Sequence, residues 1–255
     1  MKIDTFLEKG CSHHICEDYI KYDKDLDMLS LSDGCSSSPD TDIGARVLVI
    51  GSFNTFSSFF NFENGYFIDY IYELYRTLIS KNIAHQNPLD ATLISYFPYI
   101  GKVVFFGDGI FFTKDNQGNI NLYQVEYESG APFYLSYNLS INRTQTYFKE
   151  FGNYKKYIIT NGVKMECPID KPVILNNIAD VQFAGIASDG LLSYMKENYN
   201  IPLKQIINDV FDFKSTNGEF LKRRMNKINK IHGKEQIRHY DDVSIGMVYF
   251  GEENE

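Results

Sequence analysis

The sequence predicts an α+β fold in which helices cover β-sheets, within a single domain spanning residues 1–255. Three observations lead to this prediction. Strand-like apolar runs occur early, in the middle and at the end of the chain, whereas helical spacing is confined to an early and a late stretch. Hydrophobic residues make up 44% of the chain, which is enough for a sizeable core. No internal repeat or low-complexity linker divides the 255 residues.

The first third of the chain predicts strand structure followed by two helices. Residues 27–32 alternate as in a strand, with Leu29 and Leu31 on one face. Thr41 or Asp42 can cap a helix that begins near Ile43. A second helix is expected from Tyr66 to about Asn82, because its apolar residues recur at helical spacing.

The middle of the chain is predicted to be rich in β-strands. Asn161-Gly162 suits the tight turn of a hairpin, because both residues tolerate positive φ. Residues 126–153 are rich in aromatic residues but lack clear periodicity, which predicts a long irregular connection. A substrate-selecting flap and a merely structural connection are both open interpretations of it. The strands expected here are residues 91–96, 102–113 and 120–125.

The last third predicts one central strand, three helices and a final strand. Residues 181–188 are apolar on both faces, which is typical of a strand inside a sheet. Helices are expected at residues 191–198, 202–211 and 217–231, and the final strand at residues 243–250.

Composition narrows the classes of function. Acidic residues outnumber basic ones, 33 to 25, and the resulting net charge of -8 argues against a nucleic-acid partner. No apolar run reaches the roughly 20 residues of a membrane span, and the opening MKIDTFLEKG is too polar for a secretory leader. The four cysteines predict free thiols in a reducing compartment, hence a cytoplasmic protein; they are Cys11, Cys16, Cys35 and Cys167.

Acidic residues lie at turns next to strand-like runs along almost the whole chain. Carboxylates that converge on one cleft must bind cations or repel each other. Oxygen ligands select magnesium or manganese over zinc, and a glycine after an aspartate lets its carbonyl reach the same ion. From the residues alone, a metal site and a set of ordinary turns are both open. The acidic sites are Glu17-Asp18, Asp33-Gly34, Asp189-Gly190 and Asp241-Asp242.

Five short motifs follow one another in order along nearly the whole chain. They are Gly10-Cys-Ser-His13 with Cys16-Glu17-Asp18, Leu31-Ser-Asp33-Gly34 with Gly44-Ala45, Phe106-Gly107-Asp108-Gly109, Ala187-Ser-Asp189-Gly190-Leu191, and Asp241-Asp242-Val-Ser244. In this order they resemble the motifs of the metal-dependent Ser/Thr phosphatases of the PPM class, the type 2C phosphatases, in their bacterial variant.

The resemblance implies a four-layer α-β-β-α sandwich of two antiparallel sheets flanked by helices. It also implies a phosphoserine or phosphothreonine protein as substrate, hydrolysed by a metal-activated water. The cofactors implied are two Mn²⁺ or Mg²⁺ ions, with a third, weaker site. Asp33 would bridge the two ions, with the Gly34 carbonyl on one of them. The other ligands implied are Asp189 and Asp241 on the second ion, Glu17 and Asp18 around the first, and Asp108 with Asp189 at the third site.

The sequence departs from this family at the group that holds the phosphate. Many members place an arginine before the Glu-Asp pair, and His13 and His14 stand at the nearest equivalent positions. His13 is the candidate to bind the phosphate or to act as general acid beside Asp33; alternatively it only packs. Gly109 replaces the usual serine of its motif. These departures motivate a second hypothesis, a pseudophosphatase that acts as a binding or regulatory module.

Two further patterns have competing interpretations. Cys11, His13, His14 and Cys16 invite a zinc site, but their spacing is too tight for paired knuckles. The basic residues between Lys222 and Arg238 form either a solvated helix face or a docking surface for a phosphoprotein or acidic partner.

Overall fold

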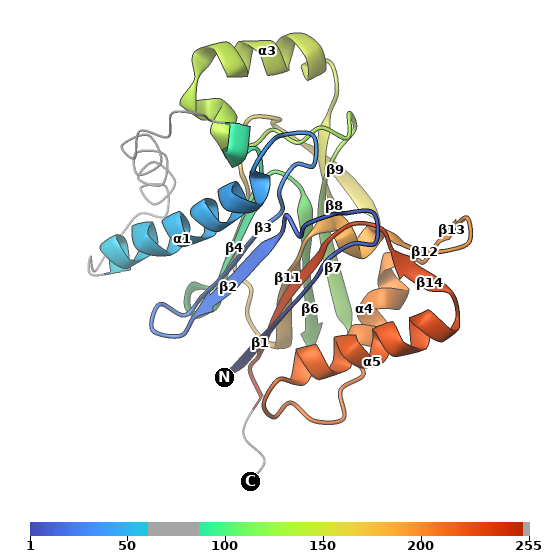
Figure 1. Ribbon diagram of the computed structural model, residues 1–255. Coiled ribbons are helices and arrows are strands. Elements are labelled where there is room, and N and C mark those ends of the chain that lie inside the picture. Colours follow the sequence, from blue (N-terminus) through green and yellow to red (C-terminus); the bar gives the residue numbers. More distant parts are fainter. Residues whose placement is uncertain (61–86, 252–255) are drawn as a thin grey trace.

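The computed structural model describes residues 1–60 and 87–251, with only the backbone at residues 58–60 (Figure 1). The helix predicted over residues 66–82 lies outside the described residues. The elements, with η marking 3-10 helices, are β1 (Lys2–Glu8), β2 (Tyr19–Asp23), β3 (Met28–Ser32), α1 (Thr41–Phe60), η1 (Asn87–Leu89), β4 (Leu93–Phe97), η2 (Pro98–Ile100), β5 (Lys102–Phe106), β6 (Gly109–Asp115), β7 (Ile120–Tyr127), η3 (Leu135–Leu139), α3 (Ile141–Phe151), β8 (Lys156–Thr160), β9 (Val163–Cys167), β10 (Val173–Leu175), β11 (Val181–Ala187), η4 (Asp189–Leu192), β12 (Tyr194–Lys196), β13 (Tyr199–Asn200), α4 (Leu203–Phe211), α5 (Phe220–Lys234), β14 (Ile237–His239) and β15 (Val243–Tyr249).

Antiparallel sheets and helices form the mixed α+β fold that the sequence predicts. One sheet has seven strands in the order β1-β15-β11-β6-β7-β8-β9, and another has five in the order β10-β5-β4-β3-β2. A small third sheet has the order β13-β12-β14. The predicted central strand, β11, lies between β15 and β6. Among the described residues, no helix has the length and apolar character needed to cross a membrane.

Alternating side chains of the two large sheets enter different hydrophobic clusters. Leu31 and Phe111, from different sheets, belong to one cluster that contains residues of both. Met28, on the opposite face of β3, packs in a second cluster with residues of α1. Phe112, next to Phe111, packs in a third cluster with residues of α4 and α5. Accordingly, α1 lies beside β2, β3 and β4, whereas α4 and α5 lie beside the other large sheet (Figure 1).

The predicted strand over residues 102–113 is two strands, β5 and β6, which belong to different sheets. Gly107 and Gly109 have φ of 94° and 132°, and this backbone conformation turns the chain sharply between the sheets. The prediction of one strand was wrong because the run is apolar throughout apart from Asp108. The turn matters for function because it presents the Asp108 side chain.

Two other predictions were wrong. Residues 126–153 are not irregular: they complete β7 and form η3 and α3, where Phe133 packs edge-to-face on Tyr147 with ring centroids 4.9 Å apart. Aromatic residues on both sides of the turns hid the helical spacing. Residues 191–198 do not form a helix but the end of η4 and strand β12, because Tyr194 pairs with His239 of β14. Tertiary pairing overrides local propensity here.

The hairpin predicted across Asn161-Gly162 is confirmed. It joins β8 to β9, and the two turn residues have φ of 50° and 88°. The late helices and the final strand are also confirmed, as α4, α5 and β15.

Candidate functional site

The acidic motifs lie at one end of the strands. At this end of the seven-stranded sheet, Glu8 pairs with Val243, and Ala187 pairs with Ile245. Asp189 therefore follows β11 at the place where Asp241 and Asp242 precede β15. In the five-stranded sheet Ser32 pairs with Tyr19, so Asp33 and Asp18 are neighbours in the same way. Asp108 occupies the turn between the sheets.

Asp33 lies at the centre of these carboxylates. Its backbone N–H donates to the Thr92 hydroxyl at 3.1 Å, and its carbonyl accepts the Thr92 N–H at 2.8 Å, which fixes the end of β3. Burial raises the pKa of Asp33 well above its ordinary value, and the charges of Asp18, Asp189 and Asp241 act in the same direction. Asp33 therefore faces acids from three other segments of the chain.

Asp108 faces the same group from the turn between the sheets. Burial raises the pKa of the Asp108 carboxyl well above its ordinary value, followed by the charges of Asp189 and Asp241. The pKa of Asp241 is raised for similar reasons, by burial and by the charge of Asp189. Negative charges that raise each other's pKa repel one another, so their proximity costs stability unless a cation neutralises them.

Asp18 is the most buried acid of the group, with 2% of its surface exposed. By strict hydrogen-bond geometry neither of its carboxylate oxygens has a partner within the described residues. Burial raises the pKa of Asp18 to about 7, the nearby side chains of Ser244, Asp33 and Ser188 act to lower it, and the charge of Asp242 acts with burial. A buried carboxylate with unsatisfied oxygens is the arrangement that a positive ligand completes.

Asp241 and Asp242 have different roles although they are adjacent. The Asp241 side chain is 41% exposed, whereas that of Asp242 is 1% exposed. Asp242 accepts the backbone N–H groups of Gly10 at 2.7 Å and Glu17 at 2.6 Å, and so anchors the loop between β1 and β2 to the start of β15. Asp242 belongs to the predicted Asp241-Asp242 acidic pair but was not among the predicted ligands. In the sequence, only its position beside Asp241 before an apolar strand pointed to it.

His13 is held by three carboxylates. Its Nδ1 lies 3.1 Å from Asp242 Oδ2 and 3.7 Å from Glu17 Oε2, and its Nε2 lies 3.3 Å from Asp241 Oδ1. Burial acts to lower the pKa of His13, but the three carboxylates outweigh it and raise that pKa above its ordinary value. His13 is therefore more easily protonated than a free imidazole.

Glu17 links the cluster to the loop after β3. Glu17 Oε1 accepts the hydroxyl of Thr41 at 3.0 Å, and Thr41 is the first residue of α1. The helix thus begins slightly before the predicted Ile43. Thr41 lies inside the helix, and its hydroxyl binds Glu17 instead of capping the helix. A Cβ at Gly34 would lie 2.9 Å from the Glu17 backbone carbonyl oxygen, so the glycine permits this close approach.

Ligand-type atoms gather most tightly around His13. Within the described ranges, one group of three such side chains brings its atoms within 4.8 Å of one another, and it consists of His13, Glu17 and Asp242. The predicted ligands Asp33, Asp108, Asp189 and Asp241 are neighbours but are not gathered this closely. The cysteines of the zinc interpretation do not belong to the group.

A buried ion pair ties α3 to the loop that follows Asp33. Arg143 Nη2 lies 2.6 Å from both carboxylate oxygens of Asp90. Asp90 also accepts the Ser38 hydroxyl at 3.1 Å, and its backbone carbonyl accepts the Cys35 N–H at 2.9 Å. Tyr134 lies beside Cys35 and faces the acids: burial raises its pKa well above the ordinary value, with Cys35, Asp108 and Asp33 contributing. Sequence reasoning missed this connection.

The fold is similar to those of solved phosphatases over its full length. No protein-family model matches the sequence, and no curated protein matches it in a sequence comparison. The PPM Ser-Thr phosphatase MsPP from Mycobacterium smegmatis has a TM-score of 0.59 and 13% identity, covering 98% of this chain and 99% of that one. Serine/threonine phosphatase Stp1 from Staphylococcus aureus has a TM-score of 0.57 and 13% identity, covering 98% and 95%.

A protein that is not named as a phosphatase has a similar fold. A Caenorhabditis elegans sex determining protein has a TM-score of 0.57 and 13% identity, covering 97% of this chain and 64% of that one. The chain therefore has the fold of the PPM Ser/Thr phosphatases. At identities this low, the likeness concerns the fold alone.

Proposed function

We propose that this protein is a metal-dependent phosphomonoester hydrolase, and specifically a protein serine/threonine phosphatase. The observation that carries the proposal is the convergence of acids from separate segments at one end of a PPM-type fold; they are Asp18, Asp33, Asp108, Asp189 and Asp241. Asp18 adds two buried oxygens without partners. An all-oxygen donor set fits Mn²⁺ or Mg²⁺.

The residues that would hold two ions are those of the acidic motifs. Asp33 would bridge the two ions, with the Gly34 carbonyl on one of them, Asp189 and Asp241 on one side, and Glu17 and Asp18 on the other. Asp108 would serve a third ion together with Asp189. When bound, two such ions supply a water of lowered pKa as nucleophile and neutralise phosphoryl oxygens.

His13 would provide the proton for the leaving group. The three carboxylates raise its pKa and so favour the protonated imidazole, and its side chain remains 15% exposed. Asp242 holds the ring by Nδ1, which leaves Nε2 on the side of Asp241. A protonated ring in this position can donate to the serine or threonine oxygen as its bond to phosphorus breaks.

The rival function is a pseudophosphatase that binds a partner without turnover. One observation favours it: both ring nitrogens of His13 already face carboxylates. A cation occupied in this way holds a substrate phosphate less well than an arginine, whose fork binds two oxygens at once.

Turnover of p-nitrophenyl phosphate with and without Mn²⁺ tests the proposal. We expect metal-dependent turnover in the natural chain. In Asp33→Ala we expect a loss of at least about 100-fold, because the proposed bridging ligand of the metal ions is removed. Asp170→Ala removes an acid elsewhere and should be silent. Calorimetry with Mn²⁺ separates the rivals. Metal binding without turnover in folded protein would favour the pseudophosphatase. Absence of both metal binding and turnover would contradict the proposal of an enzyme.

The architecture supports the proposal at a coarser level. We infer four layers, because one hydrophobic cluster joins the two large sheets and the two others join each sheet to its helices. We also infer one domain, because β1 and β15, from opposite ends of the chain, are paired along their whole length.

A further inference from the structure

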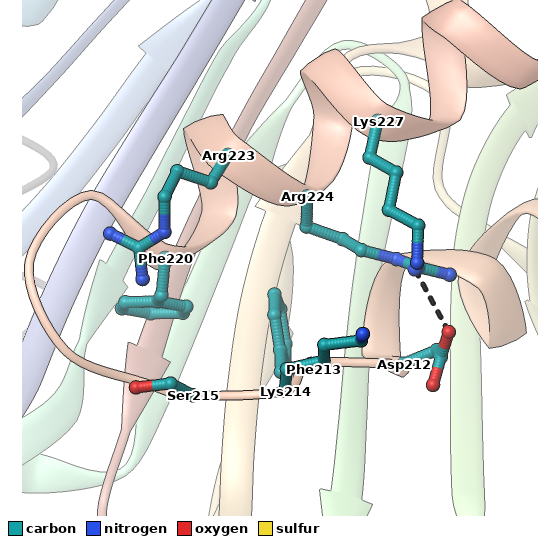
Figure 2. Close-up of a pocket in the computed structure, with 8 residues that line it drawn as sticks. All are labelled: Asp212, Phe213, Lys214, Ser215, Phe220, Arg223, Arg224 and Lys227. Atoms are coloured by element: carbon teal, nitrogen blue, oxygen red, sulfur yellow. Dashed lines mark ion pairs between the residues drawn. The ribbon is translucent and has the colours of Figure 1, made fainter.

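A pocket with a basic rim lies between α5 and the segment that follows α4. Its volume is about 250 Å³. Figure 2 shows Arg223, Arg224 and Lys227 extending from α5 toward that segment. A second pocket of about 440 Å³ shares Phe213, Lys214 and Ser215 with the first and is also lined by Lys2 and Lys114. The first pocket is lined by Asp212, Phe213, Lys214, Ser215, Phe220, Arg223, Arg224 and Lys227.

The floor of the pocket is aromatic and well packed. The Phe213 and Phe220 rings meet edge-to-face with centroids 5.2 Å apart, and Phe220 is 1% exposed. Phe213 also stacks on Phe183 of β11 at 5.5 Å. The floor is therefore held by the sheet and by α5, and an incoming apolar side chain would meet a preformed surface.

The rim carries more positive charge than its acids neutralise. Asp212 is the one acidic residue among the lining residues of the two pockets, and it already forms an ion pair with Arg224 at 2.8 Å. Lys2 Nζ donates instead to an amide oxygen of Asn217 at 2.6 Å, and Arg223 donates to the Asn217 backbone carbonyl. In the part of the chain that the structure describes, no carboxylate forms an ion pair with Lys2, Lys114, Lys214, Arg223 or Lys227.

This concentration of positive charge occurs on a chain whose net charge is -8. It also lies away from the candidate active site. Lys2 pairs with Tyr249 at one end of the β1–β15 ladder, and Glu8 pairs with Val243 at the other, next to Asp242. At about 3.3 Å per residue, the two ends are roughly 20 Å apart. The pocket therefore serves something other than the reacting phosphate.

We propose that the pocket docks an acidic segment of a protein partner, with one apolar side chain on the aromatic floor and Asp or Glu residues on the rim. The volume favours this occupant, because pockets for whole small ligands are typically about 300–1,000 Å³. Charge complementarity favours it as well, since Lys and Arg rims attract acidic partners and steer their approach.

Binding of a fluorescein-labelled peptide tests the proposal. The probe has a central Phe flanked by three Asp or Glu residues on each side, and the comparison peptide replaces these acids with Gln and Asn. We expect the acidic peptide to bind at least about tenfold more tightly at low salt, with affinity falling as salt increases. A single-stranded oligonucleotide that bound more tightly than the acidic peptide would overturn the proposal.

Charge-reversal variants locate the site. Arg223→Glu with Lys227→Glu should weaken binding at least about tenfold, because like charges then line the rim. The matched control, Lys149→Glu with Lys196→Glu, makes the same change in net charge at exposed positions outside the pocket. Equal loss in both double variants would contradict a local site. If the first variant does not fold, Lys214→Gln with Lys227→Gln replaces it, and unchanged affinity there would also contradict the proposal.

The readouts keep docking separate from catalysis. Hydrolysis of p-nitrophenyl phosphate should be unchanged in the pocket variants, because this small substrate does not reach the pocket. Peptide binding is measured without turnover, so it remains informative if the protein proves to be a pseudophosphatase.

Discussion

The Nδ1 atom of His13 lies 3.1 Å from Oδ2 of Asp242, a carboxylate that is 1% exposed. The same carboxylate accepts two backbone N–H groups from the loop that carries His13. One acidic residue at the start of β15 thus fixes the loop between β1 and β2. Asp241, one residue earlier, is free of this task and faces the other acids of the site.

Asp242→Asn should destabilise the metal-free protein. The amide can replace only one of the two acceptor oxygens, so its NH₂ group would face a backbone N–H. We expect a loss of about 2 kcal/mol in the free energy of unfolding, which is typical of an unsatisfied buried polar group. Urea denaturation of the metal-free protein measures it.

Asp241→Asn is the matched comparison. The pKa of Asp241 is raised by burial and by Asp189, so removing its charge relieves repulsion in the metal-free protein. We expect unchanged or slightly increased stability together with loss of Mn²⁺ binding. Equal destabilisation in the two variants would show that the adjacent acids do not divide their roles.

Arg143→Met should destabilise the connection between α3 and the loop after Asp33. Asp90 is 6% exposed in its side chain, and the change leaves it without its charged partner. Removing one member of a buried pair typically costs about 3 kcal/mol or more. Lys155→Met is the control: Lys155 pairs with Glu166 at the same 2.6 Å, but both are more than half exposed. Because solvent screens that exposed pair, its loss should cost far less than the loss of the Arg143 pair.

The two variants are compared by urea denaturation. Similar losses would mean that burial does not decide the strength of the Arg143 pair. A double variant with Asp90→Asn should lose less than the sum of the single changes, because it removes the unpaired charge as well.

The sequence predicted most of this fold because its patterns are local. The Asn161-Gly162 turn depends on a few neighbouring residues, and the hairpin that it predicts is present in the structure. The contacts that organise the site are not local. Arg143 and Asp90 are 53 positions apart in the sequence, and Asp242 and Gly10 are 232 positions apart. No periodicity within either segment indicates such a pairing.

The same distinction explains the missed features of the site. Asp241 and Asp242 are identical in type and adjacent, so only their tertiary neighbours distinguish a ligand candidate from an anchor. The break at Asp108 was hidden because the apolar runs on either side read as one continuous strand. In the structure they are strands of different sheets. Its flanking glycines, Gly107 and Gly109, were the local signal for a change of direction.

Lys156→Met should change the pH dependence of stability. Lys156 is 1% exposed, and burial lowers its pKa to about 8 from an ordinary 10.5. Between these values the unfolded chain binds more protons than the folded one, so this group's contribution to stability rises with pH. From pH 7 to pH 9.5, the natural protein should gain about 2 kcal/mol relative to Lys156→Met.

Urea denaturation at the two pH values measures this difference. Lys164→Met, at a half-exposed position on the neighbouring strand β9, should show no gain of this sign. A pH-independent difference for Lys156→Met would mean that the lysine is charged to the same extent in both states.

Gly44→Ala and Gly233→Ala should have opposite effects although both glycines lie in helices. A Cβ at Gly44 in α1 would overlap the Pro88 carbonyl oxygen of η1, so α1 must move or η1 must shift. We expect a loss of about 3 kcal/mol, at the upper end of overpacking costs. A Cβ at Gly233 in α5 would meet nothing within 4 Å, and alanine there should stabilise the helix by roughly 0.5–1 kcal/mol. Thermal and urea denaturation compare the two, and a neutral Gly44→Ala would contradict the close packing of α1 on η1.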